Sequence, residues 1–375
     1  MKKISLSIPK TKFTEIKNFN FINEPLTKEF SLFYSYFYGS NLIIVKDSLL
    51  SEIDKVFKGV NNERLITISD SFFSNFTVVS ETLIKDRKNK YAFELWQRLI
   101  VWAEKWRKEN DLEIHLGTPY YFIAVASLSQ FDIDAGSIFM HLALKEDRKH
   151  HKKWFNLPAN LFLSLNPRKD QYISHHTNYM LGFIRDRLDG KGNSKGRYKQ
   201  HYYKKRSGSL KYSDFRRKFL GKRSEDYLEI KYFFVHSLLR LWRLRRIHKS
   251  NKGENTIAPL IYSQVISGLL LTLEVLLKKK YSNLPMLGNL FKKFFKDEGL
   301  GKPDLKQIET DRDRDFEKWI EDCIKQESML GDFSLSYGLR NYTSHTIESQ
   351  QVIWKKQTNI FQSVMNCIFR VLEVL

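Results

Sequence analysis

Apolar residues recur every three or four positions along most of this chain, the spacing of helices that pack on one face. Tyr91–Lys108 shows the pattern clearly, and so does Tyr227–His248. Leu260–Leu277 is nearly all apolar, so we expect it at the centre of a bundle. From Thr346 to Leu375 an apolar stripe continues without Gly or Pro, which predicts one long helix. The pattern therefore predicts a fold that is mainly all-α.

A helical hairpin is predicted between Thr118 and Asp147, with a short turn over Gln130–Asp134. Small residues stand where the two helices would cross, and in this the segment resembles one tetratricopeptide-type hairpin. No second copy follows at a step of 34 residues. Two interpretations stay open: a helix-turn-helix within an all-α region, or part of a repeat array.

Two short β-branched runs leave helix and strand unresolved near the N-terminus. They are Leu42–Val45 and Leu65–Ile68.

Glycines and prolines divide the region before the last helix. Pro285 and Gly288 predict a linker, followed by a short helix over Leu287–Phe295. Further breaks are expected at Gly299, Gly301 and Pro303. The alternation of charged and apolar residues in Leu305–Leu330 predicts an exposed helix.

The length of 375 residues allows two or three structural units. A hydrophobic content of 42% with 14% aromatic residues excludes a mainly disordered chain. We expect a mostly α-helical N-terminal region over 1–185 that senses a trigger or binds substrate. A basic aromatic linker or RNA-binding segment would follow over 186–225, and a four-helix domain over 226–375.

Cysteine usage and hydropathy indicate a soluble protein of the reducing cytoplasm. Cys323 and Cys367 are the two cysteines, too far apart in sequence to suggest a thiolate metal site or a disulfide framework. Pro259–Leu277 comes nearest to a membrane span, but it contains Glu274 and several hydroxyl residues. A buried helix is therefore favoured, and no membrane partner is expected.

Positive charge is concentrated in one short segment. The whole chain has a formal net charge of +21, whereas Lys191–Arg223 alone holds 13 Lys or Arg and one acid, Asp214. Aromatic residues are interleaved with these cations, so rings could stack on unpaired bases while cations bind phosphates. A solvated flexible linker is the alternative interpretation. The candidate RNA-binding residues are Tyr202, Tyr203, Lys204, Lys205, Arg206, Arg216 and Arg217.

The hexapeptide Arg340-Asn341-Tyr342-Thr343-Ser344-His345 brings a permanent cation, an amide and an imidazole close together in sequence. An Arg and a His at this spacing carry little information alone, because Arg243/His248 and Arg168/His175 are similarly spaced. Three features distinguish the hexapeptide. They are Asn341 directly after the arginine, a position just before the terminal helix, and an approach through Gly331 and Gly338 that is expected to be flexible.

With helices predicted around it, Arg340-Asn341-x-x-x-His345 resembles the active-site signature of the HEPN superfamily. These all-α ribonucleases act in toxin–antitoxin, abortive-infection and CRISPR-associated defence systems. The resemblance covers about residues 226–375. It implies a metal-independent endoribonuclease that leaves a 2′,3′-cyclic phosphate. It also implies a homodimer, because two copies of the motif would share one cleft, and it raises an antitoxin or trigger as a partner.

The chemistry of these side chains agrees with that activity. His345 could remove the proton of an RNA 2′-hydroxyl, and a nearby helix N-terminus would favour its neutral form. Arg340 could bind two phosphate oxygens and stabilise the charge that develops on them. Asn341 could orient the imidazole or the phosphate. Glu274 is either a polar partner of this motif or a residue that reaches solvent.

Other motifs give weaker indications. His150-His151 and His175-His176 are adjacent pairs whose side chains point apart on a helix, so neither pair predicts a metal site. Gly190-Lys191-Gly192 lacks the rest of a nucleotide-binding loop. We therefore expect no metal and no cofactor. Two alternative functions stay open: a non-catalytic helical RNA-binding or adaptor protein, and a peptide-binding scaffold of tetratricopeptide type.

Overall fold

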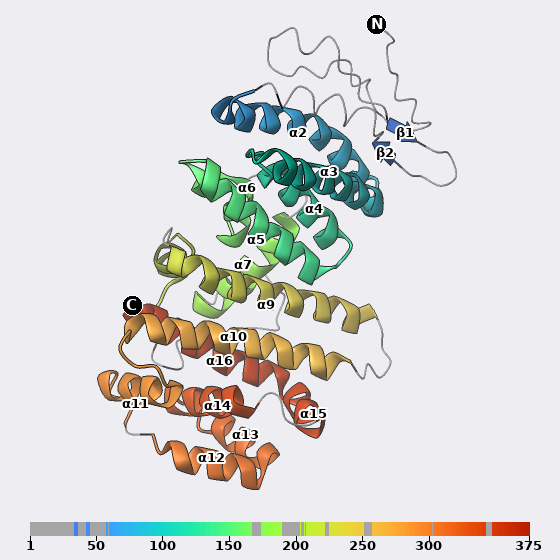
Figure 1. Ribbon diagram of the computed structural model, residues 1–375. Helices are drawn as coiled ribbons and strands as arrows, with labels where there is room; N and C mark the ends of the chain where they lie inside the picture. The colour runs from blue at the N-terminus through green and yellow to red at the C-terminus, as the bar shows by residue number, and fades with distance from the viewer. Residues whose placement is uncertain are drawn as a thin grey trace, which may run out of the picture. The chain divides into compact units, whose positions relative to one another are not determined.

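The computed structural model describes residues 60–166, 174–189, 208–221, 225–250, 257–301, 303–342 and 347–375. It also describes Lys58, Tyr203, Arg206 and two short strands. The described residues divide into two compact units, one ending at Leu161 and the other beginning at Phe162. Helices dominate both units, which confirms the all-α prediction (Figure 1). The division differs from the expected boundaries at 185 and 225, since the described part of the basic segment belongs to the second unit.

The first unit is a set of antiparallel helices around an aromatic core. In order these are α2 (Asn62–Lys85), α3 (Asn89–Asn110), α4 (Gly117–Ser129) and α5 (Ile133–His150), followed by the short turn η2 (Trp154–Asn156). α4 packs on both α3 and α5, and α2 covers α3 and α4. Phe72, Phe76 and Trp96 are fully buried between these helices. α6 (Pro158–Leu163) lies across the division between the units.

The predicted hairpin is present as α4 and α5. Its turn lies at residues 130–132, where Phe131 adopts a positive φ of 64° and the Asp132 carboxylate accepts a hydrogen bond from the backbone N–H of Ala135. That bond caps α5 at its N-terminus. Gly136 permits the close crossing, because a Cβ there would lie 2.6 Å from Cγ of Leu128.

Of the two ambiguous runs, one is strand and the other helix. Ile43–Val45 forms β2, which pairs antiparallel with β1 (Tyr34–Tyr36). Leu65–Ile68 lies inside α2, and Leu65 is fully buried there. Packing on the neighbouring helices therefore outweighs the β propensity of the second run.

The second unit is built around α10 (Ala258–Lys280). This helix contacts α9 (Glu225–Ser250), α11 (Leu287–Asp297), α14 (Met329–Tyr342), α15 (Ile347–Lys355) and α16 (Gln357–Val374). α10 and α16 run side by side through the middle of the unit (Figure 1). Among the described helices, α10 alone is long and apolar enough to cross a membrane. Its twelve buried residues, from Ala258 to Leu277, are those expected of a central core helix.

Shorter elements complete this unit. They are α7 (Ser174–Leu188), α8 (Tyr212–Phe215), the π-helical turn η4 (Arg216–Leu220), α12 (Leu305–Arg314) and α13 (Phe316–Lys325). From 225 onward the described chain thus contains eight helical segments, α9 to α16, where the sequence predicted a four-helix domain.

Two segments predicted as single helices are each interrupted. Leu305–Leu330 divides at Asp315, whose extended backbone ends α12 and whose carboxylate accepts from the N–H of Lys318 to cap α13. It divides again after Lys325, where α13 ends before α14 begins at Met329. The terminal stripe divides at Lys356, between α15 and α16. A polar run over 355–359 interrupts the apolar stripe at that point, so burial does not hold the helix continuous there.

Candidate functional site

Each unit holds a group of residues that could carry chemistry. The arginine motif consists of Arg340, Asn341 and His345, and the histidine–aspartate cluster consists of Asp70, His115, Asp147 and His151. The first was predicted from the sequence. The second became visible only in the fold.

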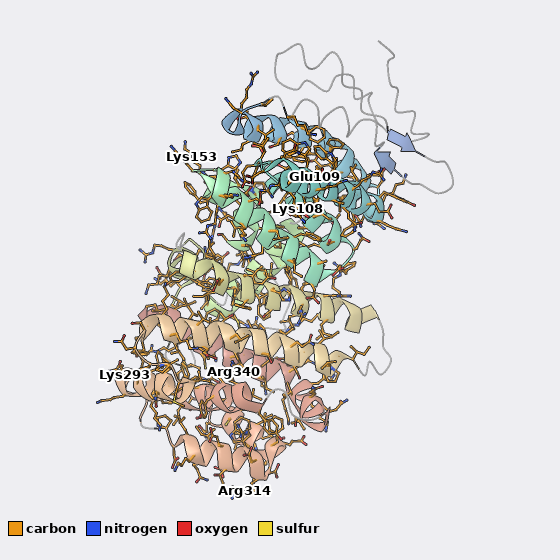
Figure 2. All side chains as sticks on the ribbon, viewed as in Figure 1. Lys108, Glu109, Lys153, Lys293, Arg314 and Arg340 are labelled. Atoms are coloured by element: carbon orange, nitrogen blue, oxygen red, sulfur yellow. The ribbon has the colours of Figure 1, made fainter. Side chains whose placement is uncertain are left out.

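Arg340 stands in the last turn of α14 and is labelled in Figure 2. Its Nε–H donates to Oε2 of Glu274 on α10 at 3.0 Å, forming an ion pair between the two helices. Among the described residues, its terminal Nη groups make no hydrogen bond. Asn341 follows on the same helix, whereas His345 lies outside the described residues.

Glu274 is therefore a partner of the motif, which is one of the two expectations left open. Its carboxylate is 13% exposed and also accepts from Lys278 Nζ at 2.6 Å. Burial disfavours ionisation of Glu274, but the hydrogen bond from Lys278 and the charge of Arg340 hold its pKa below the usual value. The carboxylate stays charged and fixes the arginine fork at one end.

The approach to the motif is a helix rather than a flexible loop. Gly331 and Gly338 both lie within α14. A Cβ on Gly331 would lie 2.5 Å from the carbonyl oxygen of Cys323, and one on Gly338 would lie 2.4 Å from the Trp319 ring. These glycines thus permit close packing of α14 on α13, which contradicts the expected flexibility.

Part of the basic segment is built into the second unit. Tyr203 is fully buried, and its hydroxyl donates to the Glu373 carboxylate of α16. Burial and the neighbouring Glu373 raise the pKa of Tyr203. Arg206 Nε donates to Oδ2 of the buried Asp332 at 3.0 Å. The expectation that Tyr203 stacks on bases is therefore wrong for this structure, because its ring faces core residues.

Two of the candidate RNA-binding cations remain at the surface. Arg216 and Arg217 are exposed on η4. Arg217 forms a 2.9 Å ion pair with Asp214, and Arg216 donates to the side chain of Asn166 at 3.3 Å. Tyr202, Lys204 and Lys205 lie outside the described residues.

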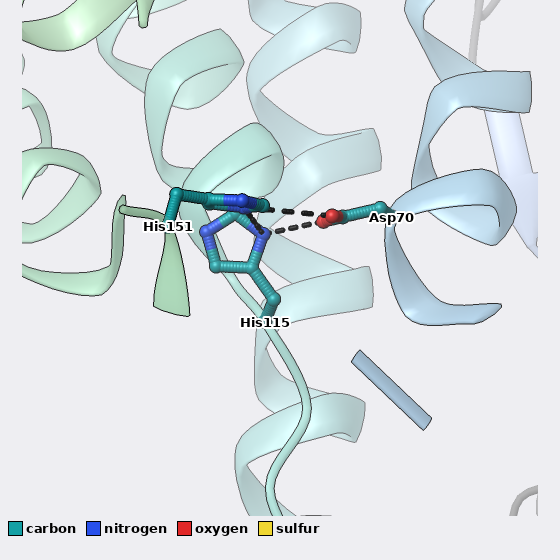
Figure 3. Close-up of side chains that lie close together, drawn as sticks. All are labelled: Asp70, His115 and His151. Carbon is teal, nitrogen blue, oxygen red and sulfur yellow. Dashed lines mark hydrogen bonds and ion pairs between the residues drawn. The ribbon is translucent and has the colours of Figure 1, made fainter. Parts of the chain in front are cut away.

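The histidine–aspartate cluster joins three elements of the first unit, and Figure 3 shows Asp70, His115 and His151 from it. Asp70 comes from α2, His115 from the loop before α4, and Asp147 and His151 from the end of α5. His115 Nδ1 is hydrogen-bonded to Asp70 Oδ1 and lies 3.3 Å from His151 Nε2. His151 Nε2 lies 3.5 Å from Asp70 Oδ2. On its other side, His115 Nε2 lies 3.2 Å from Asp147 Oδ1.

Backbone hydrogen bonds hold His115 in this position. Its N–H donates to Oγ of Ser69 at 3.1 Å, and the next N–H, of Leu116, donates to Glu146 Oε2 at 3.2 Å. Gly117 leaves room for the side chains, because a Cβ there would lie 2.2 Å from Asp147 Oδ1 and 2.4 Å from His115 Nε2. The loop is thus shaped around the imidazole.

The two carboxylates control the charge of His115. Burial alone would lower its pKa, but hydrogen bonds to Asp147 and Asp70 outweigh burial and raise the pKa to about 9. Burial also raises the pKa of Asp147 despite the adjacent His115. His115 is consequently a buried imidazolium at neutral pH, and its charge is balanced by the carboxylates beside it.

A cavity of about 330 Å³ opens beside the cluster. Asp70, His115, Asp147 and His151 line it together with Ser74, Glu81, Thr118 and Tyr121. His115 is 3% exposed, whereas the side chains of Asp70 and His151 are 30% and 31% exposed. The two more exposed groups therefore face the accessible side.

This cluster was not predicted from the sequence. His151 was set aside because its neighbour His150 points elsewhere, and the structure agrees that His150 does not join it: its Nε2 lies 3.7 Å from Glu146 Oε2. The true partners lie 36 and 81 positions away in the chain. The spacing of Asp147 and His151, four residues apart at the end of a helix, is the one local signal that places two of these groups on one face.

No family model, curated protein or solved structure matches this chain.

Proposed function

We propose that this protein is a metal-independent endoribonuclease of the HEPN type that acts in a toxin–antitoxin or anti-phage defence system. The observation that carries the proposal is the ion pair between Arg340 and Glu274. One edge of the guanidinium is held by a partly buried carboxylate, while its terminal donors make no hydrogen bond to another described residue. Such an arginine is oriented in advance to bind a phosphate through two parallel hydrogen bonds.

The reaction follows from the groups in the motif. His345 accepts the proton of the RNA 2′-hydroxyl, and the 2′-oxygen attacks the adjacent phosphorus. Arg340 stabilises the negative charge on the phosphorane, and Asn341 orients the phosphate. The bond to the 5′-oxygen then breaks, leaving a 2′,3′-cyclic phosphate. The leaving oxygen takes a proton from an imidazolium, which in a homodimer is His345 of the second copy.

The charge of the chain suits an RNA substrate. The net charge is +21, and exposed Arg216 and Arg217 add surface cations in the same unit as the motif. Cations of this kind contribute sequence-independent affinity for phosphates, which weakens as salt is raised. Because Tyr203 is buried, we propose that RNA bases stack on other aromatic residues of the basic segment, such as Tyr202, which lies outside the described residues.

The test is cleavage of total RNA in excess chelator. We expect the wild-type protein to release fragments with 2′,3′-cyclic phosphate ends and His345→Ala to release none. Arg243→Ala is the matched control, because it removes an arginine from the other Arg-x4-His pair of this unit and should cleave normally. Equal cleavage by wild type and His345→Ala, or none by either, would contradict the enzymatic function and favour a non-catalytic RNA-binding adaptor.

The shared active site has a separate test. Excess His345→Ala protein mixed with wild type should lower the cleavage rate per wild-type chain, since mixed dimers hold only one intact motif. A rate that is unaffected by the variant would show that each chain acts alone.

A further inference from the structure

The nitrogen and oxygen atoms of the histidine–aspartate cluster are spaced as metal ligands are. Each of Asp70, His115 and His151 offers one ligand atom, and these three atoms lie within 4.8 Å of one another. His151 Nε2 lies 3.3 Å from His115 Nδ1 and 3.5 Å from an oxygen of Asp70. Two ligands at about 2.0–2.1 Å from a tetrahedral zinc ion are about 3.3 Å apart, so these two separations fit an ion between the groups. The third pair, His115 Nδ1 and Asp70 Oδ1, is hydrogen-bonded and lies closer, so metal binding requires these two side chains to part.

We propose that Asp70, His115 and His151 bind a divalent transition-metal ion, for which Zn²⁺ is the reference, with its fourth coordination position open to the adjacent cavity. The site lies in the first unit and is independent of the arginine motif in the second.

The hydrogen bond to Asp147 directs the correct nitrogen of His115 toward the ion. Asp147 Oδ1 lies 3.2 Å from His115 Nε2 and accepts a hydrogen bond from the N–H of that nitrogen. The Nδ1 lone pair is then available to a metal, which takes the place of the Nδ1 proton. A carboxylate that orients a metal-binding histidine in this way is a common second partner of metal sites. Asp147 is thus a positioning residue rather than a ligand.

Burial differs among the ligands in a way that suits an open site. His115 is almost fully buried and fixed by the Ser69 and Asp147 hydrogen bonds. The Asp70 side chain is 30% exposed and borders the cavity, so it is free to move outward as an ion separates it from His115. Three protein ligands and one exchangeable ligand are the arrangement of catalytic zinc sites, whereas structural sites have four protein ligands.

The chemistry of the three ligands also restricts which metal ions the site can bind. Two imidazoles and one carboxylate favour Zn²⁺, Co²⁺, Fe²⁺ or Mn²⁺ over Mg²⁺ and Ca²⁺, which take mainly oxygen ligands. A water in the fourth position would lie in a cavity that is also lined by Ser74, Glu81, Thr118 and Tyr121. The cavity could therefore place a small polar molecule against the ion.

The experiment measures binding of Zn²⁺ and Co²⁺ to the full chain after chelation and dialysis. We expect one Zn²⁺ per chain by calorimetry and a visible absorption band of four-coordinate Co²⁺. His151→Ala should abolish both signals, and Asp147→Asn should raise the Kd by about 10–100-fold. His141→Ala, an exposed histidine of the same helix, should bind as the wild type does.

Folding is checked in parallel by thermal unfolding. Zn²⁺ should raise the Tm of the wild type and of His141→Ala but not that of His151→Ala. If His151→Ala does not fold, His151→Asn replaces it. A wild-type Kd weaker than on the order of 100 μM for both ions, or tight binding that survives loss of His151, would overturn the proposal. RNA cleavage is read in chelator, so failure of the metal site leaves the ribonuclease proposal to its own test.

Discussion

The arginine motif and the histidine–aspartate cluster each contain several potentially reactive side chains, but they differ in how far apart those residues lie in the sequence. The motif places Arg340, Asn341 and His345 within six consecutive positions, so it can be found by reading the sequence. The cluster collects groups from three elements, and nothing in the sequence joins Asp70 to His115. A short motif can be found without a fold, whereas a cluster from distant positions cannot.

Each unit contains a buried basic side chain whose pKa burial lowers, but the net pKa shifts of the two are opposite. Burial alone lowers the pKa of His115, but two carboxylates reverse this and raise it to about 9. Lys231 in α9 is 1% exposed, and burial lowers its pKa to about 8. Hydrogen bonds to Asp147 and Asp70 therefore outweigh burial at His115, whereas burial sets the direction of the shift at Lys231.

The largest expected effect is on RNA cleavage, from a substitution in the arginine motif that leaves the histidine–aspartate cluster intact. Arg340→Lys keeps the charge but loses the planar fork, so RNA cleavage should fall by about 10²–10³-fold. Zinc affinity should not change. The rate is measured on a defined RNA at saturating enzyme, and a loss below tenfold would exclude Arg340 as the phosphate-binding group.

Replacing Lys231 tests the effect of burial. Its pKa is lower in the folded than in the unfolded protein, so folding costs stability at neutral pH, and the cost disappears as pH rises from about 8 to 10.5. Lys231→Met should raise the free energy of unfolding at pH 7 by about 2–3 kcal/mol. The gain should shrink by pH 10. Urea unfolding at both pH values measures it, and a gain that is equal at pH 7 and pH 10 would contradict burial as the cause.

A pair of glycine substitutions compares packing in the two units. Gly117→Ala drives a methyl group into Asp147 and His115, so it should lower the free energy of unfolding by about 1–3 kcal/mol. Gly182→Ala in α7 is the control, because its Cβ would meet no atom within 4 Å. That change should stabilise by about 0.5–1 kcal/mol. Thermal unfolding separates them, and effects of equal sign would show that the cluster is not tightly packed.

The smallest effect concerns the support of Arg340. Glu274→Gln removes the charge that fixes the guanidinium, and kcat/KM for RNA should fall by about tenfold, mainly through kcat. Lys278→Met removes the other partner of Glu274 and should change kcat/KM by less than about twofold. A loss that appears only in KM would instead assign Glu274 to substrate binding.

Sequence patterns predicted most of the helices because burial sets the period of apolar residues. Tyr91–Lys108 became α3, Leu260–Leu277 became the central α10, and the hairpin turn fell at residues 130–132. The patterns failed where one polar residue ends a helix, as at Asp315 and Lys356. They also failed for Tyr203 and Arg206, whose partners Glu373 and Asp332 lie over 120 positions away.

The contrast between the units is tested most directly by RNA cleavage before and after metal removal. The chain is stripped with chelator until no Zn²⁺ remains, and the rate and the fragment ends are then measured. We expect an unchanged rate, 2′,3′-cyclic phosphate ends, and no cleavage by His345→Ala. Cleavage that stops on stripping and returns with Zn²⁺ would contradict the account, because the reaction would then depend on the first unit's metal site.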